Sequence, residues 1–463
     1  MTATQRLGES SAFAPRSYLS LTPELRSGRV TPRDVLEACL DAIARLDPTI
    51  GAFVQLAERG TMHKVADAAT ERWRSGQPLS PIDGMPIAVK DIVETIDMPT
   101  GQGSPLWEGT RTRRDSASVC ALREAGAIIV GKVTTTEFAA ADTFAATSNP
   151  HDPTRTPGGS SSGSAAAVGA GMVPAALGTQ VTGSILRPAS YCGCVGFKPS
   201  VGAINRGGSY DYFSQSCQGV LAATLRDAWG VARAIADRAG GDPGYVGLRG
   251  TVDFSDRARP TRLAVLETGG WVDTSKGARD AFAAVTAQLA AAGIELLGRG
   301  DDPEIEALER QIDDALALTR RINAWEGRWP LNTYADRDAS KLSGGARERL
   351  ATAVQLTQAD YREAVGLRSA ARDAFAQVAG RYDAAVTLAA TGAAPVGLSS
   401  TGNPGMNVAA SLLGTPALSL PILEDEGLPL GLQLIGGSDG DAALFAVATG
   451  LLETVLARPD LIG

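Results

Sequence analysis

The chain has 463 residues, of which 44% are hydrophobic and 20% are charged, and its formal net charge is -8 at pH 7. These values are typical of a globular protein with enough apolar residues for a large core. The acidic balance, without any basic stripe or cluster, argues against a nucleic-acid partner.

The organisation along the chain indicates one large domain, because no linker rich in proline, glycine or charge divides it. The five cysteines are an odd number without the spacing of a disulfide framework, which favours a reducing compartment. The first residues lack the charged start and apolar centre of a signal peptide, and no run of 18 apolar residues occurs. We therefore expect a cytoplasmic protein without a membrane partner.

Residues 1–80 are predicted to be mainly helical. Thr31-Pro32 supplies a cap and a first-turn proline, and apolar residues then recur at helical spacing over residues 35–43. Asp47-Pro48 is expected to end this helix. A second helix is predicted from about residue 59 to residue 75.

Residues 81–220 hold the most distinctive segments. Ile87-Ala88-Val89 is predicted to be a short buried strand, and Lys90 at its exit cannot easily reach bulk water. Two turns of small residues follow, GGSSSG at 158–163 and GTQVTGS at 178–184, with a small-residue helix predicted between them.

Helices and strands alternate through the rest of the chain. A helix, a glycine and a strand occur in that order from Ser116 and again at residues 278–297. Further strands are predicted at residues 262–266, 384–388, 417–420 and 430–435. Strands separated by helices indicate an α/β domain with a mixed, mostly parallel sheet that helices cover on both faces.

Residues 303–380 differ from this pattern. They are rich in Ala, Arg, Glu and Asp, with Trp325 and Trp329 among them, and they are predicted to form helices outside the sheet. A structural role is the simpler interpretation of this insertion. A lid over the substrate funnel is the alternative.

Three familiar kinds of site do not fit the sequence. Residues 126–132 nearly match a phosphate-binding loop, but Val133 replaces the required Ser or Thr. The GSSSG run at 159–163 fits a nucleophile elbow, but the only histidines, His63 and His151, precede it, so an ordinary Ser-His-Asp triad is excluded. Two histidines without a paired acidic motif also argue against a metal site.

Together with Lys90 in GMPIAVKD, the two small-residue turns resemble the signature region of the amidase signature family of serine hydrolases. Ser160 lies 24 residues before Ser184, which matches the spacing of the family's bridging serine and nucleophile. The flanking segments GKVTTTEFA, NPHDPTRTPGGSSSGS and GLPLGLQLIG agree with the family pattern. The resemblance extends from about Leu36 onward, and it implies one amidase signature domain over residues 1–463.

The resemblance also implies a mechanism without any cofactor. Ser184 attacks the substrate carbonyl, Ser160 relays its proton, and neutral Lys90 is the final base. The family holds the peptide bond before the bridging serine in the cis form. The oxyanion is expected to bind the backbone N–H groups of Val181, Thr182, Gly183 and Ser184. Supporting hydrogen bonds are expected from Ser161, Thr179 and Gln180.

The sequence departs from the commonest family pattern at several positions. Gln180 replaces an aspartate, and Arg187 is displaced by one position, two features shared with a malonamidase-like branch. Arg187 is therefore expected to bind either a carboxylate of the substrate or a buried carboxylate or carbonyl group of the protein. Tyr210, Tyr212 and Phe213 are expected to form a wall for an apolar or aryl substrate.

We expect an amidase that hydrolyses small or aryl amides through an acyl-enzyme, as a monomer or homodimer. A carbamate (urethane) hydrolase with the same residues is the alternative, and esters should be cleaved as well. Two further possibilities remain open: the amidase subunit of a tRNA-dependent amidotransferase, and a binding protein that has lost catalysis.

Overall fold

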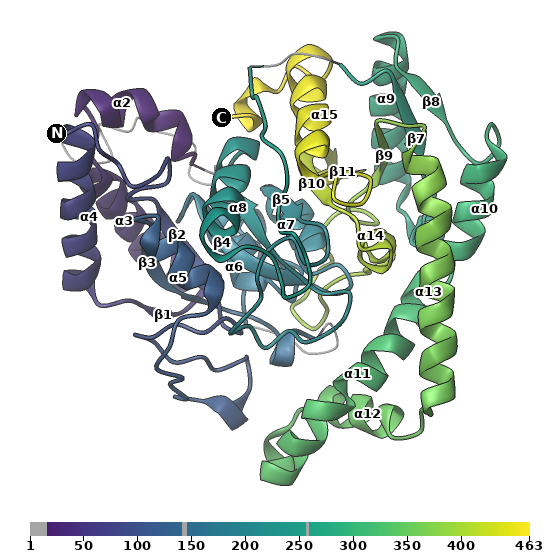
Figure 1. The fold of residues 1–463 in the computed structure, drawn as a ribbon, viewed down its shortest axis with the longest axis horizontal. Coiled ribbons are helices and arrows are strands. Elements are labelled where there is room, and N and C mark those ends of the chain that lie inside the picture. The colour runs from purple at the N-terminus through teal and green to yellow at the C-terminus, as the bar shows by residue number, and fades with distance from the viewer. Residues whose placement is uncertain (1–15, 141–145, 256–258) are drawn as a thin grey trace.

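The computed structural model describes residues 16–140, 146–255 and 259–463 (Figure 1). Its centre is an 11-stranded sheet with the order β1-β3-β2-β4-β6-β5-β10-β11-β9-β7-β8. The strands are β1 (Phe53–Leu56), β2 (Pro86–Lys90), β3 (Ile128–Val133), β4 (Ala175–Gln180), β5 (Val195–Lys198), β6 (Cys217–Ala222), β7 (Arg262–Val265), β8 (Glu295–Leu297), β9 (Ala384–Leu388), β10 (Ala417–Asp425) and β11 (Leu428–Ile435). All strands that the sequence predicted are present in this sheet.

The sheet is mixed, as expected, but parallel pairs are the minority. β2 is parallel to β3 and β4, and β7 is parallel to β8 and β9, whereas the other six pairings are antiparallel. A parallel pair needs a crossover, usually a helix, whereas short turns join antiparallel strands. The sequence interpretation missed β5 and β6 and the turn at residues 426–427 between β10 and β11, so it overestimated the parallel share.

Helices cover both faces of the sheet and both of its ends (Figure 1). α6 and α7 pack against each other and against the sheet. α8 packs against α5 and, through Trp229 and Phe445, against α15, and these three helices also contact the sheet. The helices are α2 (Thr22–Ser27), α3 (Pro32–Ile50), α4 (Arg59–Arg74), α5 (Ala117–Glu124), α6 (Ser162–Gly169), α7 (Leu186–Cys192), α8 (Leu225–Ala239), α9 (Lys276–Ala291), α10 (Pro303–Ile312), α11 (Ala315–Asp338), α12 (Gly344–Ala353), α13 (Gln358–Ala379), α14 (Val408–Leu413) and α15 (Asp441–Thr454). No helix in the described part of the chain is long and apolar enough to cross a membrane.

The first long helix, α3, begins where the sequence predicted and ends later. Thr31 and Asp34 form a reciprocal capping box at its start. The predicted end at Asp47-Pro48 is wrong, because the helix continues to Ile50 and stops at Gly51, which has a φ of 66°. Pro48 lies in the last turn, and the left-handed glycine terminates the helix instead.

Small residues allow the elements around the two serine turns to pack at backbone distance. Every residue of α6 is buried. A Cβ atom at Gly163 would lie 2.3 Å from the Ala52 carbonyl oxygen, and one at Gly169 would lie 2.1 Å from the Cys192 carbonyl oxygen. Both distances are shorter than any real contact, so glycine is required at both positions.

The second turn begins later than the sequence suggested. Residues 178–180 belong to β4, and only residues 181–185 form the turn into α7. Thr179 and Gln180 pair in antiparallel register with Gln218 and Cys217 of β6. β4 therefore leads directly into the turn, next to the end of the parallel strand β2, whose last residue is Lys90.

The insertion at residues 303–380 is helical, from α10 through α13. α11 and α12 extend away from the sheet, and α13 returns along α11 (Figure 1). A separate apolar cluster lies under this insertion and includes Ile305, Leu308, Ile322 and Phe375.

Candidate active site

Lys90 lies at the end of β2, between the parallel neighbours β3 and β4, and its side chain is completely buried. Its Nζ atom lies 2.7 Å from Ser160 Oγ, 3.0 Å from Ser161 Oγ and 2.9 Å from Thr179 Oγ1. Lys90 forms no ion pair among the described residues. Three hydroxyl groups therefore surround a lysine that has no salt-bridge partner.

The surroundings of Lys90 favour its neutral form. Burial lowers the pKa of Lys90 from 10.5 to about 7, because removal from water destabilises the ammonium form. The negative charge of Asp211 acts in the opposite direction and keeps this pKa from falling further. Lys132 lies opposite Val89 on the neighbouring strand β3, and its amine pairs with Asp91 at 3.0 Å. This second buried lysine therefore has a counter-charge that Lys90 lacks.

Ser160 lies in the first small-residue turn, just before α6, and it follows a cis peptide bond after Gly159. The turn is held from both sides. Ser162 Oγ donates a hydrogen bond to the Gly158 carbonyl oxygen at 2.9 Å, and Arg187 Nη2 donates one to the Gly159 carbonyl oxygen at 2.7 Å. These contacts fix the main chain directly before the residue whose hydroxyl contacts Lys90.

Ser184 lies in the second turn and is 3% exposed. The Gln180 side chain holds this turn, since its Oε1 atom accepts hydrogen bonds from the N–H groups of Ile185 and Leu186 at 2.8 and 3.0 Å. Its Nε2 atom donates to Ser411 Oγ at 3.0 Å. An amide thus supplies the acceptor that the usual aspartate would supply, and it adds a donor that a carboxylate lacks.

The structure places Lys90 and Ser160 in contact, but Ser184 and Ser160 form no hydrogen bond with each other in the part of the chain that is described. Among the described residues, the Ser184 hydroxyl group makes no hydrogen bond. The Ser184 turn is nevertheless tied to the Ser160 turn, because Arg187 follows Ser184 and bonds to Gly159. Hydrogen bonds at active sites are often long in the free enzyme and tighten only when substrate binds.

The turn from residue 181 to residue 184 presents free backbone donors. In the described part of the chain, none of its four N–H groups donates to a protein acceptor. Its carbonyl groups are engaged instead: Gln215 Nε2 donates to Val181, Ser411 Oγ to Thr182 and the Arg187 N–H group to Gly183, at 3.1, 3.0 and 3.1 Å. Unpaired N–H groups at a turn are suited to binding a developing negative charge.

Arg187 is completely buried and bonds to main-chain carbonyls rather than to a carboxylate. Besides its bond to Gly159, its Nε atom donates to the Thr401 carbonyl oxygen at 2.6 Å. Burial lowers the pKa of Arg187 from 12.5 to about 10. Its Nη1 atom has no partner among the described residues, and this nitrogen would lie 2.8 Å from a Cβ atom at Gly183.

The aromatic residues predicted to form a wall lie between the core and the insertion. Tyr212 is 50% exposed and packs edge-on against Trp329 of α11, with ring centroids 6.0 Å apart. The ring centroids of Tyr210 and Tyr212 lie 6.2 Å apart, and the Phe213 ring packs beside Gly327 of α11. The insertion therefore continues the aromatic surface that the sequence predicted on the loop.

Several residues that hold the site were not identified from the sequence. They hydrogen-bond either to a turn or to a side chain that holds a turn, from distant parts of the chain, and include Gln215, Thr319, Thr401 and Ser411. No short motif marks them, because their hydrogen bonds join residues that are far apart in the sequence.

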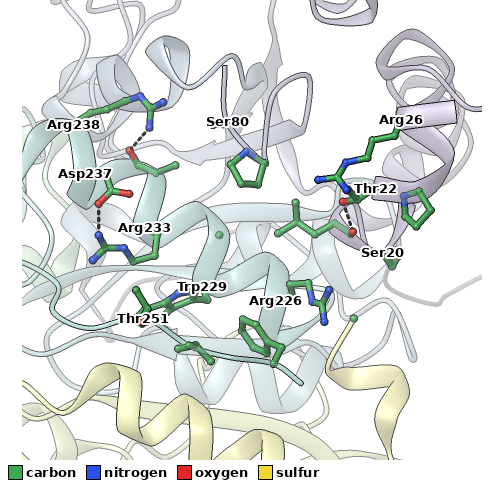
Figure 2. Close-up of a pocket in the computed structure, with 18 of the residues that line it drawn as sticks. Ser20, Thr22, Arg26, Ser80, Arg226, Trp229, Arg233, Asp237, Arg238 and Thr251 are labelled. Carbon is green, nitrogen blue, oxygen red and sulfur yellow. Dashed lines mark hydrogen bonds and ion pairs between the residues drawn. The ribbon is translucent and has the colours of Figure 1, made fainter. Parts of the chain in front are cut away.

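Neither a metal site nor the cavity drawn in Figure 2 coincides with these residues among the described parts of the chain. The described residues contain no group of three or more His, Cys, Asp or Glu side chains that could hold a metal ion. A cavity of about 1190 Å³ lies elsewhere, between the N-terminal segment at Leu19–Leu21 and helix α8 (Figure 2). It is lined by Arg26, Arg226, Arg233 and Arg238, and it includes none of the serine or lysine residues described above.

The fold and the contacts around Lys90 define an α/β enzyme whose candidate site consists of serine and lysine side chains. The sequence profile of the Amidase family matches residues 34–445. A glutamyl-tRNA(Gln) amidotransferase subunit from Chloroflexus aurantiacus is 34% identical, and the alignment covers 95% of this chain and 97% of that protein. The chain therefore belongs to the amidase family of hydrolases, which act on carbon–nitrogen bonds.

Solved structures share the fold over nearly the whole chain. An amidase crystal structure is 28% identical with a TM-score of 0.81, and the match covers 95% of this chain and 99% of that one. The peptide amidase PAM, in complex with the competitive inhibitor chymostatin, is 26% identical with a TM-score of 0.76, over 94% and 97% of the two chains. Both similarities agree with the α/β fold inferred from the sequence.

Proposed function

We propose that this protein hydrolyses amide C–N bonds through an acyl-enzyme on Ser184. The observation that carries the proposal is the completely buried Lys90, whose pKa is lowered to about 7 and whose Nζ atom lies 2.7 Å from Ser160 Oγ. A neutral amine in this position is a base that needs no histidine.

In the proposed reaction, Ser184 Oγ forms a bond to the substrate carbonyl carbon while its proton passes to Ser160 Oγ. Ser160 passes its own proton to neutral Lys90. The carbonyl π electrons move to the oxygen, which binds the N–H groups of the turn from residue 181 to residue 184. When the C–N bond breaks, the leaving nitrogen takes a proton from Ser160, and Lys90 reprotonates Ser160. Water then repeats the sequence and releases the acid.

For this relay, the Ser184 hydroxyl group has to rotate toward Ser160 when substrate binds. Gln180 holds the main chain directly after Ser184, so we expect a change of the Ser184 side-chain torsion to make this movement. We expect the carbonyl carbon of the bound substrate to bring these two hydroxyl groups into line.

An aryl group on the substrate is our preferred assignment. Tyr210, Tyr212 and Trp329 form successive edge-to-face contacts in the described structure, and Tyr212 and Trp329 remain exposed. Exposed rings of this kind can accept a further ring in the same geometry. None of the comparisons favours a carbamate over an amide, and the assay below includes one.

For Arg187 we propose the structural role. Binding a substrate carboxylate through its Nε and Nη2 atoms would take the donors away from the carbonyl groups of Thr401 and Gly159. The Gly159 carbonyl belongs to a buried residue, and a buried carbonyl that loses its donor is costly. The carboxylate-binding alternative would have to use Nη1 alone.

A second candidate function rests on the sequence comparison. The relative from Chloroflexus aurantiacus is named as one of the subunits of a glutamyl-tRNA(Gln) amidotransferase. In such a complex, this chain would release ammonia from glutamine and would require partner subunits. Affinity purification of the tagged protein from its native cell, together with a glutamine hydrolysis assay, distinguishes this function from that of a free-standing amidase.

The test of the proposed function is hydrolysis of a matched 4-nitroanilide, aryl carbamate and malonamate, with Ser184→Ala as the blank. We expect release of 4-nitroaniline from the anilide by the wild type and none by the variant. Turnover of malonamate alone would assign Arg187 to carboxylate binding. Turnover that is unchanged in Ser184→Ala, or no turnover of any substrate, would overturn the proposed mechanism.

A further inference from the structure

The loop before β6 connects the candidate oxyanion turn to the helical insertion through one side chain. The amide of Gln215 is buried, and its Nε2 atom donates to the Val181 carbonyl oxygen and to Thr319 Oγ1, both at 3.1 Å. The amide orientation is determined by this geometry, since the Val181 carbonyl can only accept a hydrogen bond. Both N–H bonds of Gln215 are therefore used.

The residue beside Gln215 is anchored to two helices of the insertion. The N–H group of Ser214 donates to Glu326 of α11 at 2.7 Å, and Arg368 of α13 donates to Ser214 Oγ at 2.6 Å. Tyr361 of α13 donates to the same Glu326 carboxylate at 2.8 Å. The loop at residues 214–215 is thus attached to the insertion by both main-chain and side-chain hydrogen bonds.

The contact at Val181 has a geometric consequence for its neighbour. In a planar trans peptide, the carbonyl of one residue and the N–H of the next point in opposite directions. A donor that holds the Val181 carbonyl therefore directs the Thr182 N–H group to the opposite side, away from Gln215. Ser411 acts in the same way on the next peptide unit, because it holds the Thr182 carbonyl and so directs the Gly183 N–H group.

We propose that Gln215 is a positioning residue for the oxyanion turn and that helix α11 is the support against which it acts. Gln215 directs the Thr182 N–H group toward the oxyanion, and Thr319 fixes the amide of Gln215 from the other side. The helical insertion is then part of the catalytic framework as well as a surface for substrate. This inference rests on the proposed amide hydrolysis.

The test replaces Gln215 with methionine, which keeps the length of the side chain and removes both donors. We expect kcat for the 4-nitroanilide to fall by about tenfold to a hundredfold, less than the loss of a whole oxyanion donor, while KM changes by less than about threefold. The dissociation constant of phenylboronic acid, which forms a tetrahedral adduct on the nucleophile, should rise by the same factor as kcat falls.

Gln288→Met is the matched control. Gln288 of α9 also donates from Nε2 to a valine carbonyl, that of Val455 at 2.7 Å, but it lies outside the candidate site. Its substitution should leave kcat unchanged. Thr319→Val keeps the shape of the side chain, removes only the acceptor on α11, and should lower kcat by about twofold to fivefold.

The inference is wrong if Gln215→Met folds and retains wild-type kcat and boronic acid affinity. It is also wrong if Gln215→Met fails to fold and Thr319→Val leaves kcat unchanged. Failure of the proposed function gives a different result, because Ser184→Ala would then keep its activity regardless of Gln215. A wild type that is active only with Ser184 present, combined with a normal Gln215→Met, refutes the positioning role alone.

Discussion

The signature region and the helical insertion are packed in opposite ways. In the signature region, every residue of α6, β4 and α7 is buried, and glycines meet main-chain atoms of neighbouring elements. In the insertion, α13 buries only a minority of its residues, and Trp329, Val354 and Leu367 remain 61%, 46% and 50% exposed. The residues of the proposed chemistry lie in or beside the closely packed region, and the proposed substrate surface lies in the more open one.

This difference follows from what each region has to do. Burial away from water favours the loss of a proton from a lysine near neutral pH, and this is the cause of the lowered pKa of Lys90. A surface that admits an aryl group has to remain open to solvent until the substrate arrives. Substitutions that separate these two requirements test the comparison directly.

The largest expected effect concerns the buried base. Lys90→Met keeps most of the side-chain volume but removes the amine beside Ser160, so we expect kcat/KM for the anilide to fall by about a thousandfold or more. Lys341→Met in the exposed part of the insertion is the control and should change kcat/KM by less than twofold. Steady-state kinetics on both variants decides the matter, and a Lys90→Met enzyme within tenfold of wild type would contradict the assignment.

A glycine pair compares the packing of the two regions. Gly169→Ala places a methyl group against the Cys192 carbonyl oxygen and should lower the free energy of unfolding by about 2–3 kcal/mol. Gly366 lies within α13, and a methyl group there would meet nothing within 4 Å. Gly366→Ala should therefore raise the free energy of unfolding by about 0.5–1 kcal/mol. Urea denaturation measures both values. Equal changes in the two variants would show that the packing contrast has no energetic consequence.

The pH dependence of activity reports the state of Lys90. Because its pKa is lowered to about 7 and the proposed reaction needs the neutral amine, kcat/KM should rise roughly tenfold per pH unit below pH 7 and level off above it. Asp211→Asn removes the negative charge that favours the ammonium form, so this limb should move to lower pH. A limb near the ordinary lysine pKa, or one that Asp211→Asn moves upward, would be inconsistent with this interpretation.

The smallest expected effect lies on the exposed side of the comparison. Trp329→Ala removes the ring that faces Tyr212, and we expect KM for the aryl anilide to rise about threefold to tenfold while KM for a small aliphatic amide stays the same. Val354→Ala removes an exposed apolar side chain elsewhere in the insertion and serves as the control. An equal rise in KM for both substrates would show that the ring does not select aryl groups.

The sequence by itself determined the features that depend on near neighbours. Apolar periodicity predicted α4 and β9 and the strand that ends at Lys90, and turns of small residues marked both serine segments. These signals are local, because helical and strand periodicity and turn chemistry are properties of a few consecutive residues. The same local reasoning failed at Pro48, where a glycine three residues later decides the end of the helix.

Only the tertiary structure decided which distant residues complete the site. Lys90, Ser160 and Thr179 meet because β2 and β4 are neighbours in the sheet, and Gln215 meets Thr319 because the insertion folds back onto the loop before β6. Each of these contacts is one hydrogen bond between residues 70, 89 or 104 positions apart, and such a bond leaves no periodic trace in the sequence. The low pKa of Lys90 has the same origin, since it depends on the exclusion of water by the whole assembled core.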